Sequence, residues 1–362
     1  MGLRILNIIN SMGIGGAEKL LVDILPMYNL HSENLVVDLL LLNGRRTFFL
    51  DALKSNFKGK IISLGVRSVY NIWHIFKICK YINKYDVIHV HLFPSLYFVS
   101  IAKFILNSKV KLIFTEHNTV NKRINSGFFR CIDRLIYRNY ALITAISPEV
   151  KDVLVRKLKL RNKIEIIYNG IKLEKFEQAK PNIIDTKFED GKDKILIQVS
   201  RFSIQKDQQT VIRAMTHLPN FVKLILVGDG ELKTTCEQLV VTLGLEKRVR
   251  FLGIRDDIPS LLRASDIVVQ SSIWEGFGIA AVEGMAAEKP VLSSDVPGLR
   301  EIIDNAGLLF TKGDDAELAR LIINLLEDRD YYSDVAAKCV SRAQRFDIGI
   351  MVQKFINIYE SV

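Results

Sequence analysis

The sequence is poor in cysteine, proline and tryptophan and has no long hydrophobic run. It holds four cysteines, eight prolines and two tryptophans among 362 residues. The cysteines form no CxxC pair, which disfavours a disulfide scaffold and predicts buried free thiols in a reducing cytoplasm. The most apolar stretch, residues 97–106, contains Lys103 and is too short to span a bilayer, which takes about 20 residues. The apolar start at residues 3–10 predicts a buried strand rather than a signal peptide.

What remains is an ordinary globular composition with 49% hydrophobic and 25% charged residues. At about 150 residues per domain, this length predicts two domains. The net charge of +10 is divided unevenly, because residues 1–175 hold 27 Lys+Arg and 12 Asp+Glu, which leaves 23 and 28 for the rest. The halves therefore carry +15 and −5.

Basic and apolar residues interleave in three stretches of the first half, 58–84, 98–111 and 122–138. In the last stretch, apolar residues from Phe128 to Ile136 recur near helical spacing among arginines. Such a helix can lie on an anionic membrane surface, and a solvated basic face over an ordinary core stripe is the alternative. No helix-turn-helix, RNP or zinc-finger signature accompanies the charge, so nucleic acid is not an expected partner. We expect a cytoplasmic protein that is peripheral to the inner face of the cell membrane.

Short apolar runs alternate with longer amphipathic segments along the whole chain. This alternation predicts an α/β protein of two doubly wound parallel sheets, Rossmann-like and facing each other across a cleft. Turn-forming residues without apolar periodicity between 169 and 193 place the boundary, giving domains 1–172 and 173–345, with a C-terminal helix at 346–362 packing back on the first. Twelve strands are predicted, at residues 4–10, 35–42, 60–63, 87–91, 111–115, 142–145, 164–167, 194–200, 222–227, 249–252, 267–270 and 290–293.

Ligands of such sheets bind beyond the carboxyl ends of the strands. The first strand is followed by a glycine loop with Gly13, Gly15 and Gly16, which lets the backbone approach a ligand at a helix start. A dinucleotide fingerprint would need glycine at Glu18, although Asp38 lies about where a ribose-binding acid would. A nicotinamide site and a turn without a ligand therefore remain alternatives.

Further candidates follow later strands. His117 ends one of them, facing the cleft, and is either functional or structural. Arg201 and Lys206, five residues apart, suit a diphosphate, although Asp207 could offset part of their charge. Gly228 lies in a further close-approach loop, and Gly253 with Ile254 offers a backbone edge for a base.

The most specific segment runs from Trp274 to Met285. Its glycines form a loop that enters a helix, and Glu275 and Glu283 are eight residues apart on one side of it, facing the cleft. Carboxylates accept hydrogen bonds in pairs, as vicinal sugar hydroxyls donate them. The alternative is an exposed surface carboxylate.

In their order along the chain, these features resemble glycosyltransferase family 4 (GT4), whose members are retaining enzymes with the GT-B fold. The resemblance rests on the glycine loop, His117, Arg201 with Lys206, residues 228–230, and the E-x7-E pair 275/283. It implies that Arg201 and Lys206 hold the diphosphate of a nucleotide-sugar of the UDP or GDP type.

The resemblance also gives each remaining position a role. Glu283 would hold the ribose, Glu275 and His117 would contact the donor sugar, and Gly15 and Gly16 would close the cleft. The amides of Phe277, Gly278 and Ile279 would lie near sugar or phosphate.

The expected activity is retaining transfer of a hexose to a hydroxyl, by front-face attack and without a metal or other cofactor, because fixed cations stabilise the charge on the leaving diphosphate. The only D-x-D, at 328–330, ends a predicted helix far from the motifs and is expected at the surface. The basic first half favours a lipid-linked saccharide acceptor in surface-polysaccharide synthesis. An epimerase or phosphorylase of the same fold, an NAD-dependent oxidoreductase and a non-enzymatic binding module are the alternatives.

Overall fold

A computed structural model of the chain describes residues 2–13, 15–32, 34–117, 126–160, 164–182, 188 and 193–362. Ile14 of the glycine loop, Lys122 and Arg123 of the third basic stretch, and residues 189–192 of the predicted boundary lie outside them. The chain forms two compact units, one of Met1–Gly170 with Ile348–Val362 and one of Ile171–Asp347.

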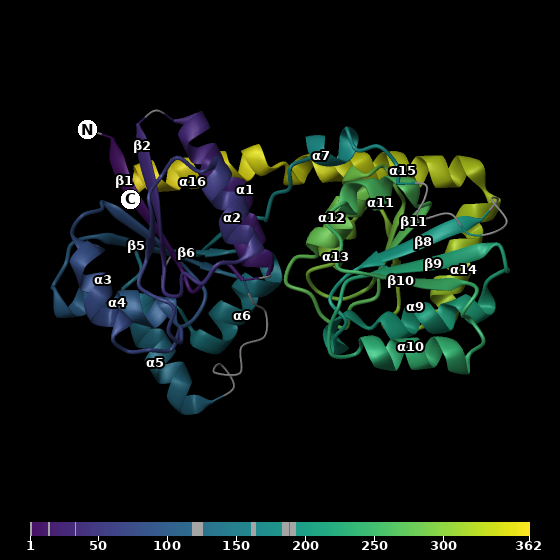
Figure 1. Ribbon diagram of the computed structural model, residues 1–362, viewed down its shortest axis with the longest axis horizontal. Helices are drawn as coiled ribbons and strands as arrows, with labels where there is room; N and C mark the ends of the chain where they lie inside the picture. Colours follow the sequence, from purple (N-terminus) through teal and green to yellow (C-terminus); the bar gives the residue numbers. More distant parts are fainter. Residues whose placement is uncertain are drawn as a thin grey trace. The chain divides into compact units, whose positions relative to one another are not determined.

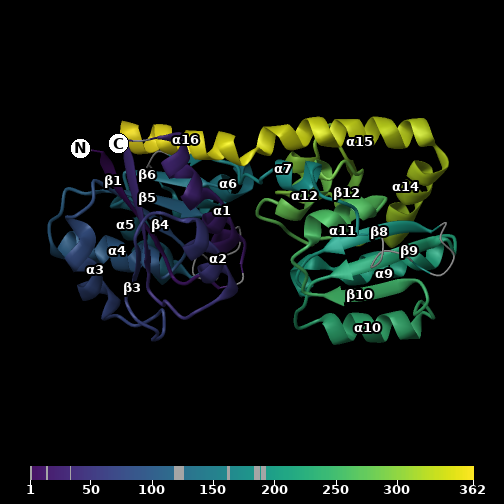
Figure 2. The ribbon, with the colours of Figure 1, turned by 45° about the horizontal axis from the view of Figure 1, so that its top comes forward.

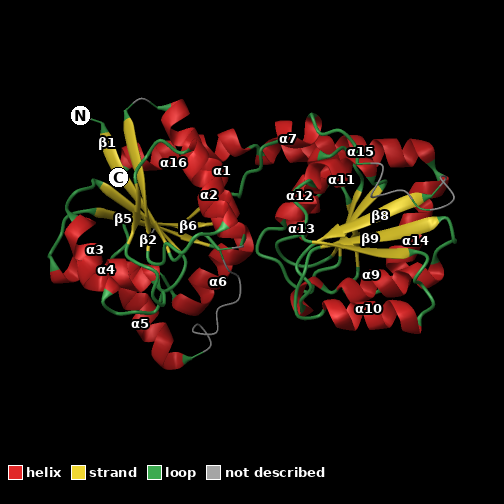
Figure 3. Cartoon of the chain, in the orientation of Figure 1, coloured by secondary structure: helices red, strands yellow, loops and turns green. Residues whose placement is uncertain are grey.

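The first unit contains a parallel seven-stranded sheet in the order β3-β2-β1-β4-β5-β6-β7. Its central strands are buried along most or all of their length because both faces are covered by helices, as Figure 3 shows. Parallel pairing sets Leu3 opposite Leu35 and Ile5 opposite Val87. The strands are β1 (Leu3–Ile9), β2 (Leu35–Leu41), β3 (Ile61–Ser63), β4 (Val87–His91), β5 (Lys111–Glu116), β6 (Leu142–Ala145) and β7 (Ile164–Ile166).

Right-handed crossovers divide the helices of this unit between the two faces of the sheet. Connections that run from β1 towards β3 place α1 (Gly16–His31) and α2 (Phe48–Asn56) on one face. Those that run from β3 towards β7 place α3 (His74–Ile82), α4 (Ser95–Ile105), α5 (Gly127–Arg138) and α6 (Pro148–Leu158) on the other (Figure 1).

The C-terminal helix α16 (Ile348–Ser361) belongs to the first unit and packs on α1, as Figure 2 shows. Met351, Val352, Phe355 and Tyr359 of α16 join the core cluster that Ile5 and Leu21 also belong to. Its tyrosine ring meets that of Tyr28 edge to face at 5.6 Å. The last residues of the chain are therefore part of this core.

The second unit contains a parallel six-stranded sheet in the order β10-β9-β8-β11-β12-β13. Its strands are β8 (Lys194–Val199), β9 (Val222–Val227), β10 (Val249–Gly253), β11 (Ile267–Gln270), β12 (Val291–Ser294) and β13 (Leu308–Phe310). The helices and 3-10 turns are α7 (Glu174–Glu177), η2 (Ile204–Lys206), α9 (Gln208–Ala214), η3 (Met215–His217), α10 (Lys233–Thr242), α11 (Ile258–Ala264), α12 (Ile279–Ala286), α13 (Arg300–Ile303), α14 (Asp315–Glu327), α15 (Arg329–Ala343) and η4 (Gln344–Phe346). The predicted fold class, two doubly wound parallel sheets, is confirmed.

Two expectations need correction, on strand β13 and on the burial of the cysteines. The three-residue strand β13 was not predicted. The D-x-D motif is exposed and ends a helix, as predicted, since Asp328 is the C-cap residue of α14. It also begins the next helix, because the Asp328 carboxylate caps α15 by accepting a hydrogen bond from the Tyr331 N–H at 2.8 Å. All four cysteines are free, but Cys131 is exposed on α5 while Cys236 and Cys339 are buried. Of the helices in the described ranges, none combines the length and apolarity needed to cross a membrane.

Candidate functional site

The loops that carry the candidate residues lie at the points where the strand order of each sheet reverses. In the second unit this point lies between β8 and β11, and the loops after these two strands hold Lys206 and Glu275. In the first unit it lies between β1 and β4, which end beside the glycine loop and at His91. Open α/β sheets bind ligands at such a reversal, because the loops diverge there and leave a crevice.

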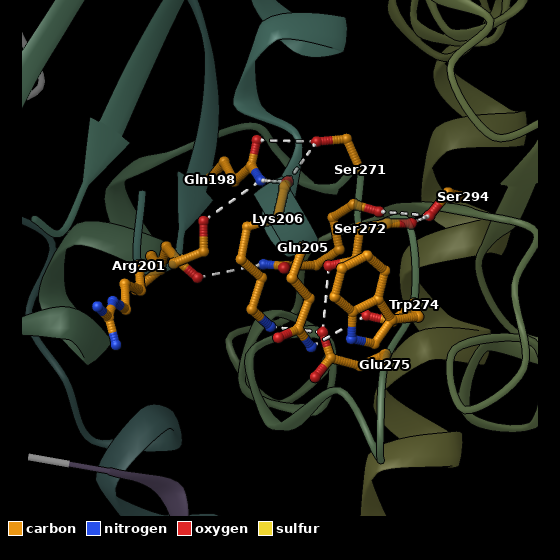
Figure 4. A network of polar contacts seen from close by, with 12 residues as sticks. Gln198, Arg201, Gln205, Lys206, Ser271, Ser272, Trp274, Glu275 and Ser294 are labelled. Atoms are coloured by element: carbon orange, nitrogen blue, oxygen red, sulfur yellow. Dashed lines mark hydrogen bonds and ion pairs between the residues drawn. The ribbon is translucent and has the colours of Figure 1, made fainter. Parts of the chain in front are cut away.

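Lys206 and Glu275 form an ion pair, although 69 positions separate them in the sequence. The Lys206 Nζ donates to the Glu275 Oε2 at 2.5 Å, and their side chains are only 21% and 12% exposed (Figure 4). The Ser272 hydroxyl donates to the same carboxylate oxygen at 3.1 Å. The ammonium group is therefore held at a fixed position in a partly desolvated environment, where its field is screened less than at the surface.

Polar side chains that the sequence analysis did not single out join the two loops. The side-chain amide of Gln205 donates to the Trp274 carbonyl at 3.1 Å, and the backbone carbonyl of Gln205 accepts from the Ile273 N–H at 2.8 Å. The Gln198 amide donates to the Lys206 carbonyl at 2.9 Å, and the Ser271 hydroxyl donates to the Asp207 carbonyl at 2.7 Å (Figure 4). A glutamine inside apolar β8 and a serine directly after β11 were the available signals.

The second predicted cation is arranged differently. Arg201 is 74% exposed at its side chain and pairs with Glu231 at 3.1 Å. Figure 4 shows its guanidinium group pointing away from Lys206. The carboxylate of the neighbouring Asp207 accepts a hydrogen bond from the Thr210 hydroxyl at 2.6 Å, whereas the ion-pair partner of Lys206 is Glu275. Both cations thus have carboxylate partners, and the structure holds only the lysine rigidly.

The loop after Glu275 leads into α12. Gly278 precedes the helix with φ +85, in the left-handed region that glycine adopts most easily. The first turn of a helix leaves backbone N–H groups, such as that of Ile279, directed at whatever precedes it. Phe277 is buried with its ring against Phe346 at 5.5 Å, and Glu283 is buried in the second turn. These residues are positioned as a binding segment requires, and their individual contacts with a ligand stay predictions.

The close-approach loops of the second unit depend on glycine. A Cβ atom on Gly228, where φ is +134, would lie 2.1 Å from the Ser200 carbonyl oxygen. The Gly228 N–H donates to the Gly253 carbonyl at 2.8 Å, which joins the ends of β9 and β10. The Ile254 side chain beyond is 69% exposed. An apolar side chain beside a backbone edge is compatible with the predicted site for a base.

In the first unit the glycine loop leads into α1, as predicted. Gly15 is the N-cap residue of α1, and a Cβ atom there would lie 2.4 Å from a carboxylate oxygen of Glu18. Gly16 has nothing within 4 Å of its Cβ position. Burial raises the pKa of the Glu18 carboxyl.

His117 belongs to a chain of polar side chains under the carboxyl edge of the sheet. His91 joins the other two side chains, with its Nε2 3.2 Å from the Asn7 Oδ1 and its Nδ1 3.3 Å from the His117 Nε2. Burial lowers the pKa of His117 to about 4 and that of His91 well below its ordinary value, so both rings are neutral at pH 7.

The residue considered for a nicotinamide ribose is structural. Asp38 stands in the middle of β2, and its carboxylate accepts from the Tyr85 hydroxyl and the Lys60 N–H, both at 2.7 Å. A ribose-binding acid would lie beyond the end of that strand. The described residues also contain no group of three or more His, Cys, Asp or Glu side chains that could hold a metal ion.

Two family models match the chain, one to each unit. The model described as "Glycosyltransferase Family 4" matches residues 14–175, and "Glycosyl transferases group 1" matches residues 179–345. Together they span the glycine loop, both predicted cations and both glutamates.

Individual relatives agree with these matches. The chain is 30% identical over 287 residues to N-acetyl-alpha-D-glucosaminyl L-malate synthase of Bacillus anthracis, covering 76% of this chain and 75% of that one. It is 27% identical over 356 residues, 94% of each chain, to a Campylobacter jejuni enzyme named N-acetylgalactosamine-N,N'-diacetylbacillosaminyl-diphospho-undecaprenol 4-alpha-N-acetylgalactosaminyltransferase.

Among solved structures, Anabaena HepE in complex with UDP and glucose superposes with a TM-score of 0.85 at 26% identity, covering 99% of this chain and 100% of HepE. A likeness that spans both units and the whole order of motifs is the likeness of a family rather than of a shared fold alone. The chain belongs to glycosyltransferase family 4 and is a glycosyltransferase of the GT-B fold.

Proposed function

We propose that this glycosyltransferase moves a hexose from a nucleotide-diphosphate donor to a hydroxyl of a lipid-linked saccharide, with retention of anomeric configuration. The reaction belongs to surface-polysaccharide synthesis at the cytoplasmic face of the membrane. The observation that carries the proposal is the largely buried ion pair of Lys206 and Glu275 at the strand-order reversal of the second unit.

The chemistry follows from where positive charge is fixed. Cleavage of the bond between the anomeric carbon and the phosphate oxygen leaves negative charge on the diphosphate. Lys206 and the N–H groups at the start of α12 are held in place before any ligand arrives, so they need little reorganisation to stabilise that charge. Arg201 reaches the diphosphate by exchanging its exposed partner Glu231, which costs little at the surface. These groups supply the stabilising charge without a metal.

Two further roles complete the donor site. Glu283 accepts hydrogen bonds from the ribose hydroxyls, and the Gly253–Ile254 edge meets a uracil or guanine base. His117 contacts the donor sugar through its ring. The UDP and glucose held by the Anabaena relative support a nucleotide-sugar donor.

The acceptor is inferred from relatives and from charge. The Campylobacter relative is named for a diphospho-undecaprenol-linked acceptor. An Escherichia coli relative, 26% identical over 335 residues, is named as a galactosyltransferase acting on alpha-D-GlcNAc-diphosphoundecaprenol. The net charge of +15 on residues 1–175 favours a substrate presented at an anionic membrane.

The test combines donor binding with transfer. UDP- and GDP-sugars are screened for a rise in melting temperature, because a ligand of the folded state stabilises it. With the donor found, Lys206→Ala and Glu283→Ala should abolish transfer to a diphospho-undecaprenol saccharide while circular dichroism stays native. Lys338→Ala is the matched control, since it removes another paired lysine from the exposed surface of α15 and should leave transfer unchanged.

Two more measurements separate the parts of the proposal. EDTA should leave the rate unchanged, and an α-configured donor should yield an α-linked product by NMR. Transfer retained in both site variants would contradict the assigned site, and an inverted product would contradict retention.

A further inference from the structure

Exposed apolar side chains gather on one part of the first unit. Among the described residues 21 large hydrophobic side chains are exposed, and 11 of them lie between residues 66 and 135, a fifth of the chain. This segment contains α3, α4 and α5, which pack side by side on the same face of the sheet (Figure 1). Single exposed hydrophobic residues are ordinary, whereas a group of this kind marks an interaction surface.

On α5 polar side chains are buried beside Ile136, and large apolar side chains are exposed. The outward side carries Phe128 and Leu135, which are 71% and 67% exposed, while Asp133 and Tyr137 are buried on the inward side. The Tyr137 hydroxyl donates to the Glu116 carboxylate at 2.8 Å, and the Asp133 carboxylate accepts from the Tyr97 hydroxyl. Because these buried hydrogen bonds fix the rotation of the helix, its apolar side faces outward as part of the fold.

The neighbouring helices continue this surface. Trp73 and Phe76, at the start of α3, are 62% and 55% exposed, and Phe104, near the end of α4, is 80% exposed. Exposed lysines follow along the outward side of α3, with Lys80 one turn beyond Phe76. We call the surface formed by Trp73, Phe76, Lys80, Phe104, Phe128, Leu135 and Arg138 the α3–α5 face.

Charge indicates what covers this face. Residues 66–138 contain 12 Lys+Arg and three Asp+Glu in the sequence. Two of the three acids, Glu116 and Asp133, are buried, which leaves Asp86 as the exposed one. Aromatic and aliphatic side chains set among basic ones fit a bilayer of anionic lipids. The acyl chains of the lipids contact the apolar side chains, and the phosphates contact the basic ones. A nucleic acid would use the charges but not the exposed leucine and phenylalanines.

We propose that the α3–α5 face docks on an anionic lipid bilayer, with Phe104, Phe128 and Leu135 entering the interface between headgroups and acyl chains. The inference deepens the proposed function, since it places the lipid-linked acceptor. Helices antiparallel to the strands begin at the sheet edge where the strands end, so α3 and α5 begin at the edge that carries His91 and His117. Docking through this face brings that edge close to the headgroups.

The first experiment is co-sedimentation of the full chain with vesicles of phosphatidylglycerol and phosphatidylethanolamine, against pure phosphatidylcholine. Binding to the anionic vesicles should weaken as salt rises. The double variant Phe128→Ser/Leu135→Ser should lose at least about tenfold in affinity for these vesicles. Its matched control, Phe48→Ser/Ile350→Ser, removes a phenylalanine and an aliphatic residue that are exposed on α2 and α16, on the opposite face, and should bind as wild type.

Charge is tested in the same way. Lys80→Glu/Arg138→Glu should lose more than about tenfold in binding at low salt, because two attractions become repulsions. Lys54→Glu/Lys58→Glu, which makes the same charge change in and after α2, should bind almost as wild type. Equal losses in a variant and its control would overturn the assignment of the face.

Fluorescence of side chains on the α3–α5 face shows whether this face contacts the vesicle. The chain has two tryptophans, so Trp274→Phe leaves Trp73 as the reporter. Its emission should shift to the blue on vesicle binding and be quenched by brominated acyl chains. A fluorophore on the exposed Cys131 of α5 should respond likewise. Sedimentation without either response would place binding elsewhere, and concentration-dependent self-association that shields Trp73 without vesicles would assign the face to a second copy.

Failure of docking is distinguishable from failure of the proposed function. Release of the nucleoside diphosphate from the donor, with water as the acceptor, is measured without vesicles. It should be the same in wild type and in Phe128→Ser/Leu135→Ser. Vesicle binding without donor turnover would contradict the proposed function alone, and turnover without vesicle binding would contradict the docking alone.

Discussion

The buried histidines of the first unit predict that acid destabilises it. His89 lies inside β4, where its Nδ1 shares a hydrogen bond with the Tyr359 hydroxyl at 2.7 Å and its Nε2 with the Thr115 hydroxyl, also at 2.7 Å. Burial, and less strongly the nearby His117, lowers the pKa of His89 from 6.5 to about 3. The folded state therefore keeps this ring neutral at a pH where the unfolded chain protonates it.

The sign and size follow from the proton balance. Because the unfolded state binds more protons, the free energy of unfolding falls as pH drops below 6.5 and levels off only near the folded pKa. Between pH 7 and pH 5 the fully buried ring of His89 costs about 2 kcal/mol, and the lowered pKa of His117 adds to the loss in the same direction. His91 shifts in the same direction. A loss of this size is a large part of the ordinary total of about 5–15 kcal/mol.

The assay uses the single tryptophan of each unit. In a Trp274→Phe background, Trp73 reports urea unfolding of the first unit alone, and its free energy of unfolding is measured from pH 7 to pH 5. His89→Gln places a side chain there that does not titrate, so its loss between the two pH values should be about 2 kcal/mol smaller than that of the parent. His217→Gln, which changes an exposed histidine in the second unit, should leave the loss unchanged.

Two outcomes would refute this account. An unchanged pH dependence in His89→Gln would mean that the ring is not held neutral by burial. An equal reduction in His217→Gln would mean that the tryptophan signal does not report the first unit alone.

Two further predictions concern the second unit. In a double-mutant cycle of Lys206→Met and Glu275→Gln, the coupling free energy from urea unfolding should be about 1–3 kcal/mol. Both charges are largely buried, and each single variant leaves the remaining charge without its ion-pair partner. Additive effects of the two substitutions would contradict an energetic coupling between Lys206 and Glu275. Gly298 has φ +89, and Gly298→Ala places a Cβ atom 2.3 Å from the Glu275 carbonyl oxygen. Gly313 has a similar φ of +80 but open space around its Cβ position. Gly298→Ala should therefore lower the melting temperature much more than Gly313→Ala does. Equal shifts would mean that backbone strain, not the close approach, is limiting.

The sheets were predictable because parallel strands covered on both faces are written as continuous apolar runs. Strand β13 escaped because Leu308–Phe310 is three residues long and set among turn formers. Its pairing, Leu308 opposite Leu292, is a contact with β12 that no local pattern records. The same limit applies to α5, where apolar spacing predicted a helix but not that Ile136 would be buried while Phe128 is exposed.

The candidate site was predictable as a set of residue types and not as a set of partners. Adjacency suggested Asp207 as the group that offsets Lys206, whereas the lysine reaches Glu275 across the reversal of strand order. Arg201 and Lys206 were expected to act alike, yet one is largely exposed and the other largely buried. Which side chains form ion pairs across a sheet depends on which loops the topology brings together. The spacing of residues along the chain does not record this topology.

Buried and partly buried polar side chains in and just after the strands explain how both units hold their loops. In the second unit Gln198 and Ser271 bind the backbone of the turn that carries Lys206. In the first, Asn10 Nδ2 donates to the Phe93 carbonyl at 2.7 Å and thereby ties the end of β1 to the loop after β4. A buried polar group without a partner is costly, so each of these side chains favours one arrangement of its loop over the alternatives. A lysine held in this way meets a developing negative charge without first being ordered, which is the condition for electrostatic stabilisation of a leaving group.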